Sequence, residues 1–218
     1  MTFKACLLAI GATVSMAAQA GPVAAYDVTN ANLTGFGGWG HTYTGTITPT
    51  GEGLANYTDG SGSLNDGSVA DGVYVDNQLF WLDNAPTITL HLEGPTKVSS
   101  VQIHGGNTNS SNYIPGMLTG WSVTIGGQSV ALSSSAFGST CYSVLCSDSV
   151  SLLGTGLENI ETDTLVLSNF QGGWEGYFSA SEVTINAVSN VPEPESLALM
   201  LAGMAALGGL VQQRRRAR

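Results

Sequence analysis

Apolar and polar residues alternate one by one in six short runs of this chain, and this alternation strongly constrains the fold. Successive side chains of a β-strand point to opposite faces of a sheet, so a period of two predicts strands with one buried face. The runs are residues 87–92, 101–104, 121–125, 129–132, 164–167 and 183–187. No window of twelve or more residues has helical periodicity with caps. The sequence therefore predicts an all-β domain.

The connections between these runs indicate short antiparallel strands. Gly, Asn, Ser and Asp are frequent in them, and Gly126-Gly127 predicts a tight hairpin turn. Residues 105–112 are expected to form a long loop, while the Gly- and Thr-rich residues 32–53 fit either bulged strands or a long excursion. Trp81 and Trp121 alternate with apolar residues and are expected in the core. We expect a single jelly-roll β-sandwich.

Residues 191–218 differ in composition from the rest of the chain. They begin with Pro192-Glu193-Pro194, continue through the apolar residues 197–211 and end in a cluster of arginines. A helix of 15 residues is about 22 Å long, which is shorter than the hydrocarbon core of a bilayer. The arginines are expected to stay on the cytoplasmic side. These features favour a sorting signal, and an ordinary C-terminal anchor is the alternative.

This order of tripeptide, apolar span and arginine cluster resembles the PEP-CTERM family of sorting tails. The resemblance implies transient anchoring in the inner membrane, recognition by an exosortase and cleavage near Pro192-Glu193-Pro194. It further implies attachment to the cell surface, or release into the extracellular matrix, of a Gram-negative bacterium that makes exopolysaccharide.

The first 20 residues have the layout of a signal peptide. Lys4 supplies a positive charge, residues 5–18 are mostly apolar, and Ala18-Gln19-Ala20 matches the small-x-small pattern that signal peptidase cleaves. The mature chain is therefore expected to begin at Gly21. Residues 21–190 remain as one domain, which is long enough to bury a core.

The domain left after both ends are removed is strongly acidic. It contains fourteen of the sixteen acidic residues of the chain and a single basic residue, Lys97. Such a surface repels phosphate backbones, which argues against binding of nucleic acid. It favours cations such as Ca²⁺, although the charge is equally explained as a means of keeping a secreted protein in solution.

Two cysteines remain in the mature domain, Cys141 and Cys146, separated by four residues. In an exported protein this spacing predicts a disulfide that closes a short loop and stabilises the fold modestly. No histidine or further cysteine is near them in the sequence, which argues against a metal site. We interpret this pair as structural.

Three short segments of the domain stand out in order along the chain. They are Leu64-Asn65-Asp66-Gly67, Phe80-Trp81 and Glu182-Val183-Thr184-Ile185. Together they resemble the discoidin-like, galactose-binding-like domains, which include the family 32 carbohydrate-binding modules. In that family a Leu-Thr-Asp-Gly loop, matched here except for Asn65, precedes a Trp, and the closing strand begins with Glu. The resemblance spans residues 57–187 and implies a sandwich that binds carbohydrate.

Many members of that family hold a structural Ca²⁺ between the Asp-Gly loop and the closing strand. The resemblance implies that Asp66 and Glu182 supply carboxylates here and that Ser63 and Ser68 supply loop carbonyls. Such a mixture of oxygens suits this hard cation. Three further acidic residues of the same region are alternative ligands: Asp59, Asp71 and Asp76. The alternative is a plain Asp-Gly turn with Glu182 facing water.

Sugar recognition requires exposed aromatic faces for stacking and a few polar groups that fix orientation. The candidates on predicted loops are Trp39, His41, Tyr113, Trp174 and Tyr177. Aromatic residues near strand ends are more often caps of the core than ligand platforms. His91 and His104 lie in the polar phase of predicted strands and are expected to face solvent.

The sequence has no nucleophile elbow, zinc-protease helix or phosphate-binding glycine loop. Paired carboxylates of a glycosidase are a spatial property and stay open. We therefore expect a non-catalytic protein that binds exopolysaccharide of a biofilm matrix. A structural matrix or surface protein without a specific ligand is the alternative, and a glycan hydrolase is the third reading.

Overall fold

The computed structural model describes residues 20–21, 23–33, 40–69, 78–81, 86–105, 118–133, 146–172, 176 and 178–188. Tertiary contacts divide the chain into two units, Met1–Val188 and Ser189–Arg218. The second unit lies wholly outside the described residues, as does the chain before Ala20. Within the described residues, no helix is long and apolar enough to cross a membrane.

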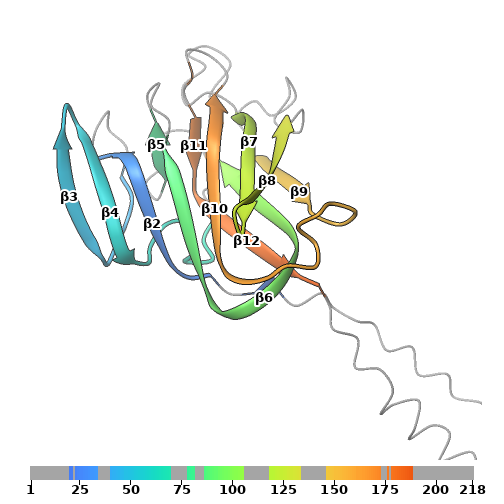
Figure 1. Ribbon diagram of the computed structural model, residues 1–218. Coiled ribbons are helices and arrows are strands. Elements are labelled where there is room, and N and C mark those ends of the chain that lie inside the picture. The colour runs from blue at the N-terminus through green and yellow to red at the C-terminus, as the bar shows by residue number, and fades with distance from the viewer. Residues whose placement is uncertain are drawn as a thin grey trace, which may run out of the picture. The chain divides into compact units, whose positions relative to one another are not determined.

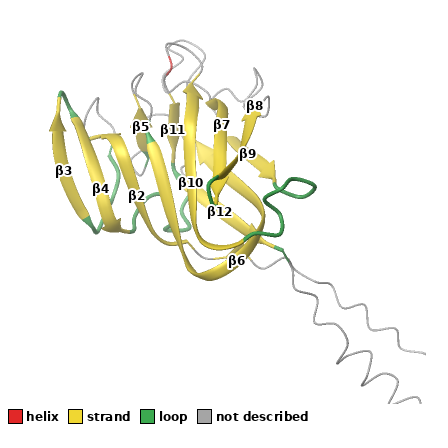
Figure 2. Ribbon diagram, in the orientation of Figure 1, coloured by secondary structure: helices red, strands yellow, loops and turns green. Residues whose placement is uncertain are grey.

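The regular elements of the described chain are strands, which confirms the all-β prediction (Figure 2). Their bounds are β1 (Ala20–Gly21), β2 (Val23–Asn32), β3 (Thr46–Gly51), β4 (Leu54–Gly60), β5 (Leu79–Trp81), β6 (Thr87–Gly105), β7 (Leu118–Ile125), β8 (Gln128–Ser133), β9 (Cys146–Ser151), β10 (Glu161–Gly172), β11 (Phe178–Ala180) and β12 (Glu182–Ala187).

The long strand β6 belongs to both layers of the sandwich. Its first half pairs with β2 and β10 in the layer β3-β4-β2-β6-β10-β7-β8. Its second half pairs with β12 and β9 in the layer β1-β12-β6-β9. Figure 1 shows β6 curving from one layer into the other. All of these pairings are antiparallel.

The predicted separation of residues 87–92 from residues 101–104 is wrong, because both runs belong to β6. Between them lie Gly94 and Pro95, which are usual strand breakers. Here the backbone stays extended while its neighbouring strand changes. Leu92 lies opposite Val23 of β2, and Val98 lies opposite Ala187 of β12. We call the part of the sandwich around residues 93–97 the bend end.

The inward side chains of both layers form one hydrophobic core. The first layer contributes Val28, Leu90 and Leu167, and the second contributes Ile103 and Ile185, all of them buried. Burial of such aliphatic side chains, each contributing about 1.5–3 kcal/mol, is the main force that holds the layers together.

Four aromatic side chains stack on one another at one end of this core. The rings of Trp81 and Phe178 lie 4.7 Å apart, and those of Phe178 and Phe170 lie 5.2 Å apart. Trp121 also stacks on Phe170, with ring centroids 6.5 Å apart. Trp81 and Trp121 are both buried, which confirms their prediction as core residues.

The hairpin predicted at Gly126-Gly127 is present between β7 and β8. Both glycines have positive φ, 57° and 80°, as a type I′ turn requires. Thr46–Gly51 shows that part of the Gly- and Thr-rich stretch is a strand, whereas residues 34–39 lie outside the described chain. Only Gly105 of the predicted loop at 105–112 is described, and it is the last residue of β6.

The alternation argument missed four of the longer strands, β2, β3, β4 and β9, and the short strands β1, β5 and β11. In β2, Asn30 adopts a left-handed conformation with φ 57°, and Ala31 and Asn32 are then buried consecutively. This irregularity interrupts the period of two. Strand β9 has the sequence Cys-Ser-Asp-Ser-Val-Ser, which is too polar to stand out.

Five strands of the first layer have an end at the same edge of the sandwich. Thr29 of β2 lies opposite Thr87 at the start of β6, and Gly172 at the end of β10 lies opposite Leu118 at the start of β7. The end of β8 joins them, since Ser133 lies opposite Gly120. We call this edge, which is at the top of Figure 1, the loop end.

Candidate functional site

The Asp-Gly turn and the closing strand meet, as the resemblance implied. The backbone N–H of Gly67 donates a hydrogen bond to Glu182 Oε2 over 3.1 Å, and the backbone of Asp66 also bonds to this carboxylate. The N–H of Val183 donates to the Leu64 carbonyl at 2.8 Å. Residues 115 positions apart in the chain therefore form one site.

The segment 61–69 is also held in place by Val23 and by Thr42. Asn65 Nδ2 donates to the Val23 carbonyl, and Asn65 Oδ1 accepts from the Gly62 N–H. Ser63 Oγ accepts from the Thr42 N–H, while the Ser63 N–H donates to the Thr42 carbonyl. Asn65, which stands where the family has threonine, thus attaches the loop to the start of β2.

The Gly-rich character of this segment has a steric cause. A Cβ on Gly62 would collide with the Thr42 carbonyl oxygen. Gly67 adopts φ 76°, a left-handed conformation that favours glycine. This conformation turns the backbone directly after Asp66, so that the Gly67 N–H points at Glu182.

Glu182 is nearly buried, with 8% of its surface exposed. Burial raises the pKa of its carboxyl from 4.5 to about 7; the Gly67 and Asp66 N–H groups act in the opposite direction, and the charge of Asp66 raises it further. A buried carboxylate beside another acidic group is disfavoured. The site would therefore be stabilised by a cation placed between the two.

The described residues fit a calcium site in part. They bring together the carboxylates of Asp66 and Glu182, but no group of three or more His, Cys, Asp or Glu within the described chain is arranged to hold a metal ion. Ser63 is buried, and its hydroxyl is bound to Thr42. The Ser68 N–H is bound to Asp66 Oδ1. Of the alternative ligands, Asp71 and Asp76 lie outside the described residues.

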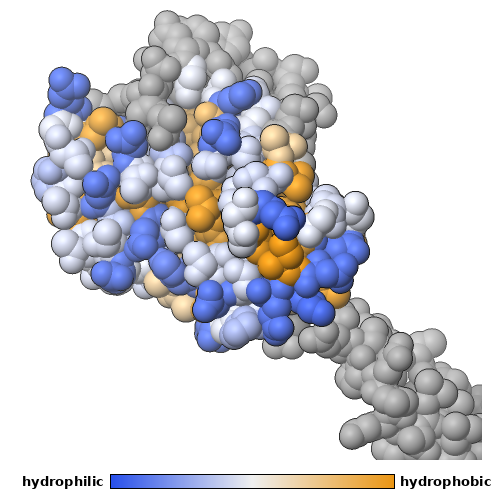
Figure 3. Space-filling view, viewed as in Figure 1, coloured by the Kyte–Doolittle hydropathy of each residue, from blue (hydrophilic) through white to orange (hydrophobic). Residues whose placement is uncertain are grey.

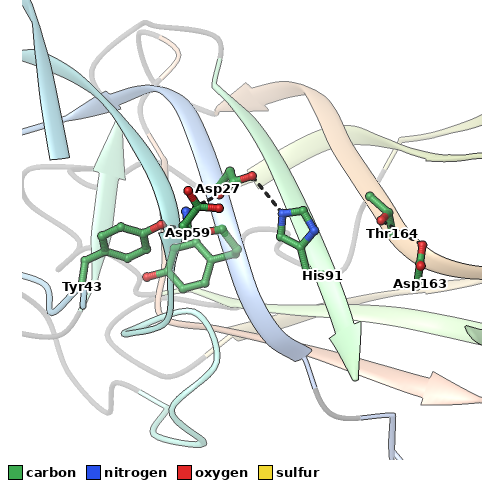
Figure 4. Close-up of polar contacts among 7 residues, drawn as sticks. Asp27, Tyr43, Asp59, His91, Asp163 and Thr164 are labelled. Atoms are coloured by element: carbon green, nitrogen blue, oxygen red, sulfur yellow. Dashed lines mark hydrogen bonds and ion pairs between the residues drawn. The ribbon is translucent and has the colours of Figure 1, made fainter. Parts of the chain in front are cut away.

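Asp59 does not lie in the loop, contrary to the prediction. It is the penultimate residue of β4 and has φ 57°. Its N–H donates to Asp27 Oδ1 at 2.8 Å, and Asp27 Oδ2 pairs with His91 Nε2, also at 2.8 Å. Figure 4 shows these groups on neighbouring strands. The sequence predicted that His91 faces solvent, and its side chain is 40% exposed. Its pairing with Asp27 was not predicted.

His104 is only half-buried, so the expectation of a solvent-facing ring holds in part. Its Nδ1 is buried and has no hydrogen-bond partner among the described residues. Burial lowers the pKa of this imidazole. In the backbone register, His104 lies opposite Glu182.

Of the five aromatic candidates for sugar stacking, His41 lies within the described chain. Its ring is half-buried and stacks on Tyr57, with centroids 5.1 Å apart. Burial lowers the pKa of His41 from 6.5 to about 4, so the ring is neutral at neutral pH. The others lie outside the described residues: Trp39, Tyr113, Trp174 and Tyr177. Cys141 does as well, and Cys146 is the first residue of β9.

The ends of the described strands nevertheless place these aromatic residues in the topology. Trp174 and Tyr177 follow Gly172, Tyr113 precedes Leu118, and both of these strand ends are at the loop end. Trp39 precedes Gly40, whose carbonyl accepts from the N–H of Gln78 just before β5. The strand ends that adjoin Tyr113, Trp174 and Tyr177 in the sequence therefore lie together at the loop end.

Comparison with known proteins identifies the C-terminal tail. A model of the PEP-CTERM protein-sorting motif matches residues 190–216. The chain carries a PEP-CTERM motif. The predicted tripeptide, apolar span and most of the arginine cluster fall within the match, which implies export and transient anchoring through this tail. No curated protein sequence matches the chain.

Several solved structures of carbohydrate-binding modules are similar to this chain. The family 32 module of C. perfringens NanJ, solved with galactose, is 15% identical, with 72% of this chain and 98% of that chain covered and a TM-score of 0.38. The CBM32 of AlyQ, solved with 4,5-unsaturated mannuronic acid, is 16% identical (50% and 75% covered, TM-score 0.32). A pectin-binding module is 10% identical (53% and 75% covered, TM-score 0.32). These values assign no ligand to this chain.

Proposed function

We propose that this protein is an exported, non-catalytic β-sandwich that binds extracellular polysaccharide through its loop end. The observation that carries the proposal is that five strands have an end there and that two of these strand ends adjoin Tyr113, Trp174 and Tyr177 in the sequence. Connections that share one edge of a rigid scaffold are the usual place for a binding site.

The core beneath the loop end supports this role. Phe178 and Phe170 flank in sequence the segment that contains Trp174 and Tyr177, and both stack on the buried Trp81. Stacked aromatic rings bury a large apolar area and fix the strands from which the connections start. Rings presented from a fixed base lose less conformational entropy when a sugar binds.

The charge of the domain favours a polysaccharide over other macromolecules. With Lys97 as its one basic residue, the domain repels nucleic acid and offers no basic cluster for acidic chains. Polar residues cover much of the face in Figure 3, with apolar residues scattered between them. Neutral sugars, or acidic sugars bridged by divalent cations, suit such a surface.

We further propose that Ca²⁺ is held at the meeting of the Asp-Gly turn and β12, with Asp66 and Glu182 as carboxylate ligands and carbonyls of residues 63 and 68 as further oxygens. The observation in favour is that the nearly buried carboxyl of Glu182 lies close enough to the exposed Asp66 for the charge of Asp66 to raise its pKa. The cation would fix the loop to the closing strand and neutralise both charges.

During export we expect signal peptidase to act after Ala20 and an exosortase to act near Pro192-Glu193-Pro194. The mature protein would then reside on the cell surface or in the exopolysaccharide of a Gram-negative biofilm. The disulfide between Cys141 and Cys146 belongs to the same proposal, since the environment there is oxidising.

Retention of the protein on the producer's own exopolysaccharide tests the binding role. The unsubstituted domain should be retained, Trp174→Ala should lose retention, and Trp174→Phe should keep part of it because a stacking face remains. Thr48→Ala, an exposed change on β3, is the matched control. Equal retention of Trp174→Ala and the unsubstituted domain would remove Trp174 from the site.

Two other outcomes would select the alternatives. No retention of the unsubstituted domain on any matrix polysaccharide would favour a structural matrix protein without a specific ligand. Release of soluble oligosaccharides from the polysaccharide would favour a hydrolase.

A further inference from the structure

The folded domain ends very close to the sorting tripeptide. The Val188 N–H donates to the Lys97 carbonyl at 2.7 Å, and this is a contact of the folded domain just past β12. Three residues, Ser189, Asn190 and Val191, separate it from Pro192. An extended chain advances at most 3.6 Å per residue, so Pro192 lies within about 14 Å of Val188.

This link does not lengthen without loss of structure, because both backbone and side-chain contacts hold the end of β12 to β6. Ala187 lies opposite Val98 in the ladder with β6. Ser99 Oγ donates to the carbonyls of Asn186 and Ala187, at 2.9 and 3.2 Å. Extending the link would break these bonds in the middle of the second layer.

The surface around Val188 carries two charged side chains and a large exposed apolar one. Lys97, the one basic residue of residues 21–190, is exposed there, and Glu161 lies opposite it in the register of β6 and β10. The turn after β9 is attached beside it by the Leu152 N–H, which donates to the Ser99 carbonyl. The next residue, Leu153, is a large apolar side chain that is 59% exposed. We call Lys97, Glu161 and Leu153 the exit surface.

We propose that the exit surface is a docking face for the membrane enzyme that processes the chain at Pro192-Glu193-Pro194. The catalytic site of an enzyme lies within its own fold, so a peptide tethered within about 14 Å of a folded domain brings the two surfaces into contact. An exposed leucine beside a lysine–glutamate pair supplies the apolar centre and polar rim that protein interfaces use. The enzyme therefore contacts the folded domain as well as the tail.

The test follows processing of the full-length chain in the producing cell by pulse-chase and immunoblot. Leu153→Ser and Lys97→Gln should each slow conversion of the precursor to the processed form several-fold. Both side chains are exposed, so the melting temperature of the purified domain should stay the same. Thr48→Ser on β3 is the control and should be processed at the unsubstituted rate.

A second set of chains carries six additional Gly and Ser residues after Ser189. With the longer link, the enzyme no longer has to touch the domain, so substituted and unsubstituted chains should be processed at equal rates. Equal rates for all chains with the natural link would overturn the proposal. Slower processing that persists with the longer link would also overturn it. Retention on polysaccharide is a separate readout, so failure here leaves the proposed binding role to its own test.

Discussion

Glu182 at the start of β12 accepts a hydrogen bond from the backbone of Gly67 across 115 positions of sequence. This bond, with that from Val183 to the Leu64 carbonyl, attaches the loop after β4 to the last strand of the domain. Burial and the charge of Asp66 together raise the pKa of Glu182 to about 7. Ionisation of Glu182 is therefore electrostatically unfavourable, and binding of a cation or a proton to its carboxylate removes this cost.

Calcium should raise the melting temperature of the domain spanning residues 21–190. A ligand that binds only the folded state stabilises it by about 2.7 kcal/mol at 100 times its Kd. Asp66→Asn and Glu182→Gln should each diminish the increase, whereas Asp163→Asn, an exposed carboxylate on β10, should leave it intact. Thermal unfolding followed by circular dichroism, with excess calcium or EDTA, measures the effect. A melting temperature that is the same in both would contradict the calcium proposal.

Without calcium, the free energy of unfolding should fall as pH rises from about 4.5 to about 7. In this window Glu182 holds its proton in the folded state and has lost it in the unfolded state, so raising the pH favours unfolding. Above the folded-state pKa the penalty is complete, and we expect it to reach about 3 kcal/mol at most. Urea denaturation in EDTA at several pH values measures the slope.

Glu182→Gln is the matched variant for this pH dependence, since the amide keeps the shape and does not titrate. The fall between pH 4.5 and 7 should be smaller in this variant by the share that Glu182 contributes. An identical slope in both proteins would mean that Glu182 titrates near its ordinary value.

Trp81→Ala should destabilise the domain by about 3–5 kcal/mol, the usual cost of truncating a buried aromatic residue. Trp81 is fully buried and stacks on Phe178, so its loss leaves a cavity beneath the loop end. Leu153→Ala, at an exposed position, should change stability by less than about 0.5 kcal/mol. Urea denaturation of both variants gives the comparison, and similar losses would argue against the stacked core.

Deletion of residues 191–218 should send the domain into the medium without processing. The deletion removes the sorting motif but leaves every described strand intact. Cell fractionation and immunoblotting measure its distribution. Sorting and processing of the shortened chain as before would show that the tail does not carry the signal. Val191→Ala, outside the tripeptide, serves as the control with an intact motif.

Several elements of the fold were accessible from the sequence because their signals are local. The runs in β7, β10 and β12 alternate strictly, and Gly126-Gly127 fixes the hairpin by its backbone conformation alone. Strand β2 was not predicted because Asn30 interrupts its alternation, and β9 was not predicted because it has little apolar character.

The candidate site was predictable where a resemblance supplied the partners and not elsewhere. The Asp-Gly turn and the closing strand were expected to meet and do so, through the hydrogen bond from Gly67 to Glu182, while the role of Asp66 and Glu182 as metal ligands stays a prediction. The pairing of Asp27 with His91 was missed, since it depends on the lateral alignment of β2 with β6. Asp59 was assigned to the same acidic loop region as Asp71 and Asp76, yet it lies within β4.

The sequence alone determined the strand character of the domain, its acidic charge and the sorting motif at its C-terminus, because each depends on residues that are neighbours in the chain. Only the tertiary structure decided that residues 87–105 form one strand shared by two layers, and that the chain leaves the domain beside Lys97. Gly94-Pro95 breaks many strands, and here the pairing partners on both sides keep the backbone extended. Those partners come from distant parts of the chain, so no local pattern could specify them.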